Sequence, residues 1–460
     1  MVTSTKKAQD PLPILAWEEL RSILTGTLIL PDSENYDESR AIWNGMIDRK
    51  PACIVKCTDV DDIVAAVNFG RKHRLLVAVK GGGHNAAGFA MCDEGMVIDL
   101  SNMKGIEVNP TTRTVIAQPG VLWGEFDKAT QQHGLAVTGG AVTTTGIAGL
   151  TLGGGIGWLM GKYGATCDNL LSAELVTADG QVLKASPEEN SDLFWAIRGG
   201  GGNFGIVTSF EFQLHQVGNI IGGMVLHPIE KIVEVLKFFR SFTQYAPDEL
   251  TVYACAMTSP EGIPMVALAL CYCGHDLNEG ERLIAPLREF GPPLADLIGT
   301  MPYLQQQSML DAAAPHGQFS YWKANQLTSL SDEAIEVIKN QVLRVTSPRT
   351  LILIEHHHGA INNVAQDSTA FMQRTSDYDF IILSLWNESE SSPIHIDWTK
   401  NFFEAMKPFF SSGVYVNALF NDEGPDRVRA AYGDNYGRLR QIKQIYDPKN
   451  FFRCNNNIVP

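Results

Sequence analysis

The chain has 460 residues, 45% of them hydrophobic and 19% charged, which is enough apolar material for two or three domains with separate cores. The formal net charge of -15 argues against a nucleic-acid partner, and the sequence contains no stripe of clustered lysine and arginine. The eight cysteines are scattered and form no CxxC pair, so we expect neither a metal site nor a disulfide framework. The N-terminal segment has no sustained apolar run before a cleavage site, which favours a cytoplasmic protein.

The first strong pattern along the chain is a helix, a strand and a glycine-rich loop. Apolar residues at helical spacing occupy 61–73, a short apolar strand follows at 75–79, and the sequence VKGGGHNAAG comes next. Consecutive glycines allow positive φ angles and bring successive N–H groups close to an anion, as around a pyrophosphate. His84, directly after the glycines, would then lie within reach of the ligand that the loop holds.

The segment between Lys128 and Lys162 has no charged side chain, although a membrane helix needs only about 20 apolar residues. It contains ten glycines and a run of three threonines, which make a poor helix and argue against a membrane span. Uncharged backbone of this kind suits close packing against a flat, neutral ring. Strand and helix patterns alternate around it, and a hairpin turns at 178–180, so we expect a mixed α/β domain.

The pattern changes near residue 217, after which strand-like runs alternate with acidic helices. We expect an N-terminal domain at 1–217 with its core at 47–217, a second domain with an antiparallel sheet at 218–412, and a C-terminal segment at 413–460. The last segment is too short to form a core and should pack on the first domain. The expected fold class is α+β.

The sequence GGGGNFG has the G-x-G-x-x-G spacing at Gly200, Gly202 and Gly205, which suggests a Rossmann fingerprint. Such a fingerprint follows a strand and opens a helix. Here helical sequence precedes the glycines and strand sequence follows them, so we reject a Rossmann domain.

Four separated motifs together resemble the berberine bridge enzyme-like branch of the vanillyl-alcohol oxidase superfamily of FAD-linked oxidoreductases. They are VKGGGHNAAG, the glycine-rich segment 139–180, DLFWAIRGGGGNFGIVT and the terminal YDPKNFFRCNNNI, and they occur in the family's order over nearly the whole length. The resemblance implies a two-part α/β FAD-binding domain of the PCMH type. It also implies a substrate domain whose antiparallel sheet, covered by helices, lies over the flavin ring.

The resemblance implies roles for individual residues as well. It makes His84 the covalent link to the flavin 8α-methyl carbon, which would make the flavin a stronger oxidant and prevent its dissociation. Val142 stands where many relatives have a second linking cysteine, so one covalent bond is expected. The other residues expected to bind FAD are Lys80, Gly81, Gly82, Gly83, Asn85, Gly88, Pro119, Gly120, Gly140, Thr144, Gly146, Gly149, Gly153, Ile206, Val207, Asn455 and Asn457.

The sequence departs from the family at the proton acceptor. Ala418 replaces the tyrosine that serves in plant-type members, and on a strand Tyr415 would point to the opposite face from it. Asn363 stands where some relatives have a glutamate. Within LIEHHHGAI, His358 is the first candidate acceptor and Glu355 the second, and on a strand their side chains point to opposite faces.

The resemblance therefore implies a covalent FAD enzyme that takes hydride from a small alcohol or sugar-like donor and reduces dioxygen to hydrogen peroxide. An amine donor stays open, because a neutral amine gives hydride without prior deprotonation. A dehydrogenase stays open as well, because Thr145 occupies a position thought to control oxygen access. A third alternative is a weakly active flavoprotein of secondary metabolism. No membrane partner is expected, and the sequence indicates no oligomeric state.

Overall fold

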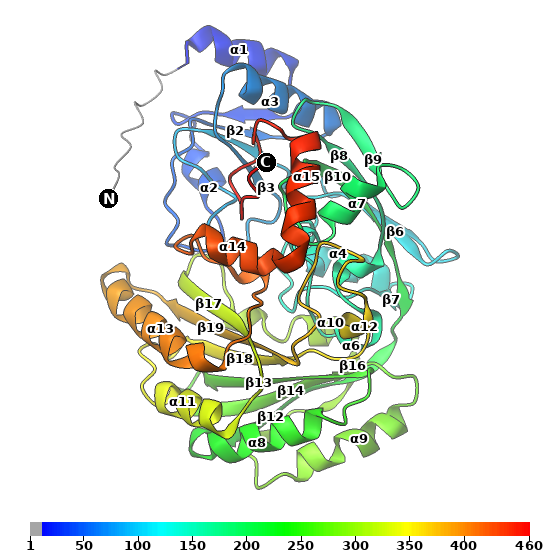
Figure 1. The fold of residues 1–460 in the computed structure, drawn as a ribbon, viewed down its shortest axis with the longest axis vertical. Coiled ribbons are helices and arrows are strands. Elements are labelled where there is room, and N and C mark those ends of the chain that lie inside the picture. Colours follow the sequence, from blue (N-terminus) through cyan, green and yellow to red (C-terminus); the bar gives the residue numbers. More distant parts are fainter. Residues whose placement is uncertain (1–11) are drawn as a thin grey trace.

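Residues 12–460 are described in a computed structural model (Figure 1). The first eleven positions of the domain expected at 1–217 lie outside the described residues. The N-terminal elements and the C-terminal helices form one body, and a large sheet with its helices forms a second body below it in this view. Within residues 12–460, no helix is long and apolar enough to cross a membrane.

A four-stranded sheet of order β1-β2-β4-β3 opens the first body. Strands β2, β4 and β3 are parallel, and α3 connects β2 to β3. Helix α3 begins at Val60 because the carboxylate of Asp59 accepts a hydrogen bond from the backbone N–H of Asp62 and caps the first turn. The elements are α1 (Ile14–Ile23), β1 (Thr27–Ile29), α2 (Tyr36–Arg40), β2 (Cys53–Lys56), α3 (Val60–Lys72), β3 (Val77–Lys80) and β4 (Met96–Asp99).

A second, antiparallel sheet of order β5-β6-β10-β8-β9 completes the first body. Its hairpin turns at Gly180, whose φ of +84° favours glycine. The strands are β5 (Ile106–Asn109), β6 (Thr114–Ala117), β8 (Leu170–Val176), β9 (Val182–Ala185) and β10 (Ile206–Gln213), and β7 (Leu135–Ala136) pairs with β11 (His215–Gln216). The helices are α4 (Trp123–Gln131), α5 (Ile147–Leu152), α6 (Met160–Tyr163) and α7 (Ser191–Ile197).

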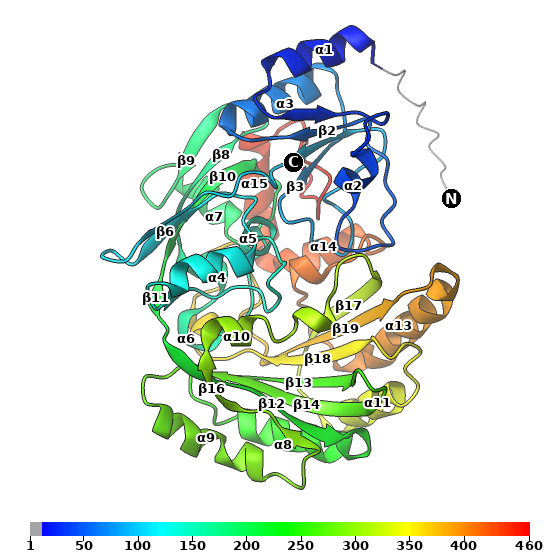
Figure 2. The same ribbon diagram turned by 180° about the vertical axis from the view of Figure 1, so that it is seen from behind.

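The second body is an eight-stranded antiparallel sheet, which confirms the fold class expected from the sequence. One face packs on helices through a large apolar core, and the other face looks toward the first body (Figures 1 and 2). The strands are β12 (Asn219–Pro228), β13 (Leu250–Thr258), β14 (Pro264–Tyr272), β15 (Ala295–Asp296), β16 (Gly299–Pro302), β17 (Phe319–Leu327), β18 (Leu351–His356) and β19 (Tyr378–Trp386). The helices are α8 (Ile232–Thr243), α9 (Leu277–Glu289), α10 (Tyr303–Gln307), α11 (Asp332–Val342), α12 (Ala360–Asn363) and α13 (Ser392–Met406).

The chain then returns to the first body through α14 (Pro425–Tyr432) and α15 (Tyr436–Tyr446), and α15, red in Figure 1, packs beside α7. The ammonium group of Lys443, fully buried, donates to the carboxylate of Asp447 at 2.7 Å and to the carbonyl oxygens of Asn203 and Phe452 at 2.7 and 2.9 Å. Because this buried charge has both a counterion and hydrogen-bond partners, it fixes the C-terminal tail against the glycine loop at 200–205.

Candidate active site

A cavity of about 380 Å³ lies between the first body and the face of the large sheet that looks toward it. Its walls come from segments far apart in the sequence: the loop at 81–85, the segment at 140–150, the loop at 201–207 and the tail at 452–456. Its floor comes from β17, β18 and β19 together with residues 415–418. The fold therefore brings all four sequence motifs to one cavity.

Two glycine segments cross each other at the wall with their backbones in contact. A Cβ atom at Gly82 would lie 2.6 Å from Cα of Gly146, and one at Gly146 would lie 2.6 Å from N of Gly82. Real side chains do not approach this closely, so both positions need glycine. Gly83 adds a φ of +69°. The sequence GGGH therefore turns sharply from β3 and presents its backbone to the cavity.

Two other glycines of the lining border the open volume of the cavity. A Cβ atom at Gly149 or at Gly202 would have no neighbour within 4 Å, although both residues line the cavity. Bare backbone beside empty volume is what a flat ring or an extended dinucleotide needs for close contact. Gly201, Asn203 and Gly205 line the same wall. The sequence analysis included this segment among the family motifs but named only Ile206 and Val207 from it as FAD-binding residues, so it missed Gly201, Gly202, Asn203 and Gly205.

His84 lines the cavity with an unused ring nitrogen. Its imidazole stacks on Trp43, with ring centroids 4.8 Å apart and an interplanar angle of 26°. Its Nε2 atom is buried and has no hydrogen-bond partner among the described residues. Burial lowers the pKa of His84 to about 4, so the ring is neutral at pH 7 and keeps a free lone pair.

Most of the residues expected to bind FAD line this cavity. Besides His84 they are Gly81, Gly82, Gly83, Asn85, Gly140, Gly146, Gly149, Ile206, Val207 and Asn455.

Seven of the residues expected to bind FAD do not line the cavity, and several of them make other contacts. They are Lys80, Gly88, Pro119, Gly120, Thr144, Gly153 and Asn457. Lys80 lies 3.4 Å from the carboxylate of Asp99 and donates to a backbone carbonyl, so its charge serves the first body.

The other six lie behind the lining or beside it. Thr144 is exposed, and Thr145 lines the cavity in its place. Gly153 lies against Asn417, where a Cβ atom would come within 2.1 Å of the amide oxygen. Gly88, Pro119 and Gly120 pack behind the loops, and Asn457 does not line the cavity, whereas Asn456 does.

The loop that carries Thr145 is held from the second body. The side-chain amide of Gln307, at the end of α10, donates to the carbonyl of Gly140 at 2.8 Å and to the buried carboxylate of Asp127 at 3.0 Å. The backbone N–H and the hydroxyl of Thr143 donate to Asp311 at 2.8 and 2.6 Å. The segment at 140–145 is therefore fixed by contacts at both ends.

The cavity floor is mostly apolar and carries one carboxylate. Trp322, Leu353, Ile381 and Leu383 project from β17, β18 and β19 into the cavity. Glu355 lies two residues after Leu353 on β18 and so shares its face. Its side chain is 14% exposed, and it is the only acidic residue of the described chain that lines the cavity.

His358 lies outside the cavity, which corrects its ranking as the first candidate acceptor. Strand β18 ends at His356, and the His358 ring stacks on that of His356 with centroids 4.5 Å apart. Its Nε2–H donates to the carbonyl of Pro247 at 3.1 Å, away from the lining residues. The structure therefore leaves Glu355 as the carboxylate in position to accept a proton.

The expectation that Tyr415 points away from Ala418 is wrong, because residues Val416–Ala418 form a 3₁₀ turn instead of a strand. Both residues line the cavity. The phenol oxygen of Tyr415 accepts from the N–H of Gly155 at 3.0 Å and from the side-chain amide of Asn417 at 2.9 Å. Because both lone pairs are engaged, the remaining capacity of this hydroxyl is to donate. Burial raises the pKa of Tyr415 far above its ordinary value, so the hydroxyl stays protonated.

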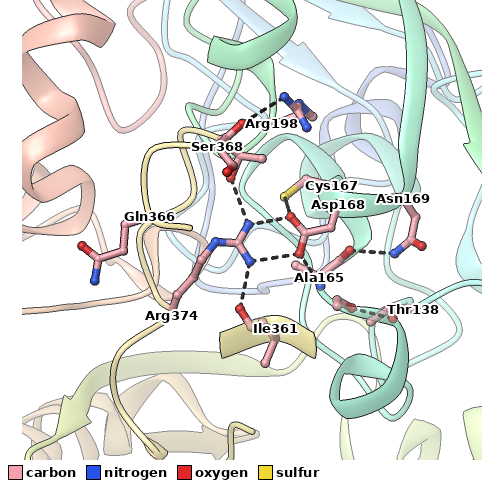
Figure 3. A network of polar contacts seen from close by, with 12 residues as sticks. Thr138, Ala165, Cys167, Asp168, Asn169, Arg198, Ile361, Gln366, Ser368 and Arg374 are labelled. Carbon is pink, nitrogen blue, oxygen red and sulfur yellow. Dashed lines mark hydrogen bonds and ion pairs between the residues drawn. The ribbon is translucent and has the colours of Figure 1, made fainter. Parts of the chain in front are cut away.

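A buried ion pair joins the two bodies (Figure 3), and neither of its residues lines the cavity. The guanidinium of Arg374, fully buried, binds the carboxylate of Asp168 through two nitrogens at 2.5 and 3.0 Å. It also donates to the carbonyl of Ile361 and to the hydroxyl of Thr369. Asp168 belongs to the segment that follows the cavity wall, so this contact sets the position of the loop at 365–377 against the first body.

Comparisons with known proteins agree with the geometry of the site. Residues 51–186 match the family described as FAD binding domain, and residues 414–459 match the family described as Berberine and berberine like. A FAD-linked oxidoreductase from Dictyostelium discoideum is 33% identical over 444 residues, with 95% of each chain covered. (R)-6-hydroxynicotine oxidase from Paenarthrobacter nicotinovorans is 28% identical, with 95% of this chain and 97% of the relative covered.

Solved structures give the same result. The crystal structure of 6-hydroxy-D-nicotine oxidase from Arthrobacter nicotinovorans superimposes with a TM-score of 0.88 at 28% identity, over 95% of this chain and 98% of that one. The fold and the glycine-lined cavity thus define a FAD-linked oxidoreductase. The chain belongs to the berberine bridge enzyme-like family of these enzymes.

Gly149→Leu is expected to abolish FAD binding without unfolding the protein. Leucine is a better helix former than glycine by about 1 kcal/mol, so α5 should persist while the new side chain fills the cavity. The matched control is Gly437→Leu, since Gly437 also lies in a helix with no neighbour within 4 Å of its Cβ position, but outside the cavity. The ratio of flavin to protein absorbance measures the result. Full flavin content in Gly149→Leu would contradict the assigned position of the cofactor.

Proposed function

We propose that this enzyme is an oxidase that carries FAD covalently on His84 and oxidises a small, largely apolar donor, a heterocyclic amine in the first place. The proposed donor class rests on the composition of the cavity floor, in which the apolar side chains of Trp322, Leu353, Ile381 and Leu383 surround the single carboxylate of Glu355. A buried sugar needs a hydrogen-bond partner for each hydroxyl, because an unpaired polar group costs about 1–3 kcal/mol. An amine needs only apolar contact and one anion.

The geometry therefore favours the amine over the sugar-like donor that the sequence analysis placed first. The name of the relative (R)-6-hydroxynicotine oxidase supports the same choice, because it describes a nitrogen heterocycle as the substrate of that protein. Attachment through His84 is supported by its neutral ring and by a buried nitrogen without a partner.

Each polar or apolar group of the cavity floor has a role in the proposed reaction. The FAD that the wall would hold would supply a hydride acceptor at flavin N5, and dioxygen would be its oxidant. Glu355 attracts an ammonium donor and takes its proton, so that the neutral amine is the form that reacts. The Tyr415 hydroxyl donates to a heteroatom of the donor, and the apolar residues exclude water from its carbon.

An alcohol is the second candidate, and the Tyr415 hydroxyl is the observation that favours it. A hydroxyl that can only donate, beside a carboxylate that can only accept, would orient an alcohol O–H toward Glu355. In this case the O–H proton must leave as hydride is transferred, and Glu355 would accept it.

A panel of cyclic amines, simple alcohols and oligosaccharides, tested for anaerobic bleaching of the flavin, separates these donors. We expect the fastest flavin reduction with an amine, followed by reoxidation in air that yields hydrogen peroxide. Reduction by oligosaccharides alone would overturn the donor class. Reoxidation much slower than reduction would show a dehydrogenase.

A further inference from the structure

Two buried residues stand directly behind Glu355 in the cavity floor. Asp379 on β19 is the register partner of Glu355 on β18, so the two carboxylates point to the same face of the sheet. His357 follows β18, and its Nε2 atom lies 3.9 Å from a carboxylate oxygen of Glu355. One side-chain nitrogen or oxygen atom of each of the three residues lies within 4.8 Å of those of the other two. Asp379 and His357 do not line the cavity, so only Glu355 meets the donor.

The two residues behind Glu355 have no hydrogen-bond partner for any side-chain polar atom. Both are 0% exposed, and both ring nitrogens of His357 and both carboxylate oxygens of Asp379 are unpaired among the described residues. No lysine or arginine of residues 12–460 forms an ion pair with Glu355 or Asp379. Two buried carboxylates without a cation are costly, and the cost falls when the group holds protons.

The electrostatics of the group agree with proton binding. Burial is the main cause that raises the pKa of Asp379; His357 lowers this pKa and the charge of Glu355 raises it, and the net result is a pKa of about 7. Five other groups interact electrostatically with this cluster. Arg427 lowers the pKa of Asp379. Burial raises the pKa of Tyr253 and Tyr415, and the charge of Glu355 adds to this effect, while burial and His357 both lower the pKa of His356 and His358.

We propose that His357 and Asp379 are positioning residues that hold, jointly with Glu355, the proton that the donor loses. This inference rests on the proposed role of Glu355 as the proton acceptor. The N–H or O–H bond of the donor breaks and its proton goes to a Glu355 oxygen, while the hydride leaves separately for the flavin. The proton is then shared with Nε2 of His357, and Asp379 supplies the negative charge that stabilises the imidazolium. After product release the proton returns through Glu355 to water in the cavity.

The pH dependence of kcat tests this inference with Asp379→Asn and His357→Gln. Removing the negative charge of Asp379 lowers the proton affinity of its neighbours, whereas removing the imidazole takes away a group that lowers the pKa of Asp379. We expect the acidic limb of the profile to move down by about one pH unit in Asp379→Asn but not in His357→Gln, and the plateau to fall about 10- to 100-fold in both variants. The matched control is His356→Gln, a neighbouring buried histidine on the opposite face, which should keep the wild-type profile. A limb that stays at its wild-type position in Asp379→Asn would overturn the inference.

Two further measurements separate this inference from its alternatives. Glu355→Gln tests the acceptor alone: if it is inactive while Asp379→Asn keeps the wild-type limb, only the present inference fails. Nitrogen NMR of histidine-labelled holoenzyme should show one imidazole, absent in His357→Gln, that remains charged to higher pH than in Asp379→Asn. Stoichiometric zinc in the purified holoenzyme, lost in His357→Gln, would instead assign the three groups to a cation and contradict proton sharing.

Discussion

Glu355→Gln is expected to slow flavin reduction by about 10²- to 10⁴-fold, the range that general-base catalysis contributes. Glutamine keeps the size and the hydrogen-bonding shape of the side chain but cannot take a proton at pH 7. Because Glu355 is the only acidic residue of the described chain in the cavity lining, no neighbour there replaces it. Stopped-flow measurement of anaerobic flavin bleaching isolates this step from reoxidation by dioxygen.

The control for this prediction is His358→Gln. The His358 ring is bonded to the carbonyl of Pro247 and lies outside the cavity, so its replacement should leave the rate of flavin reduction close to wild type. A large loss of rate in His358→Gln together with a normal rate in Glu355→Gln would reverse the assignment. Equal flavin content in both variants is required for the comparison.

Asp168→Asn is expected to destabilise the protein by about 3–5 kcal/mol, the cost of leaving one partner of a buried ion pair without its counterion. The Arg374 guanidinium is fully buried and binds Asp168 through two nitrogens, so the variant leaves an uncompensated charge between the two bodies (Figure 3). Urea denaturation, followed by intrinsic fluorescence, measures the change in the free energy of unfolding.

The contrast for this prediction is Glu19→Gln, which removes the partner of Lys72. Both side chains of that pair are more than half exposed, so water replaces the lost interaction and stability should not change. If Asp168→Asn were as stable as Glu19→Gln, the buried pair would have no role in joining the two bodies.

The sequence motifs predicted the parts of the site that are fixed by local structure. The sequence GGGH bends at β3 because its glycines allow it, and the loop then exposes its backbone and His84 together. The sequence also predicted that Glu355 and His358 would not face the same way, although His358 lies beyond the end of β18 at His356. Which of the two meets the cavity depends on how β18 pairs with β13 and β19, and a single sequence does not contain that register.

Other features could not be predicted because they depend on distant segments. Asp379 lies 24 positions after Glu355 and becomes its neighbour only through strand pairing. Tyr415 reaches the cavity because its segment forms a 3₁₀ turn held by Gly155 and Asn417. Lys80 and Thr144 belong to the right motifs but point away from the cavity, because a motif fixes the path of the backbone before it fixes each side chain.

We expect the cavity to hold FAD bonded to His84 alone, and acid precipitation of the purified protein, followed by peptide mass mapping, tests this in one step. The yellow colour should stay in the pellet, and the flavin mass should map to the peptide containing His84, with no cysteine peptide carrying it. Flavin released into the supernatant, or attached to another peptide, would contradict covalent attachment through His84.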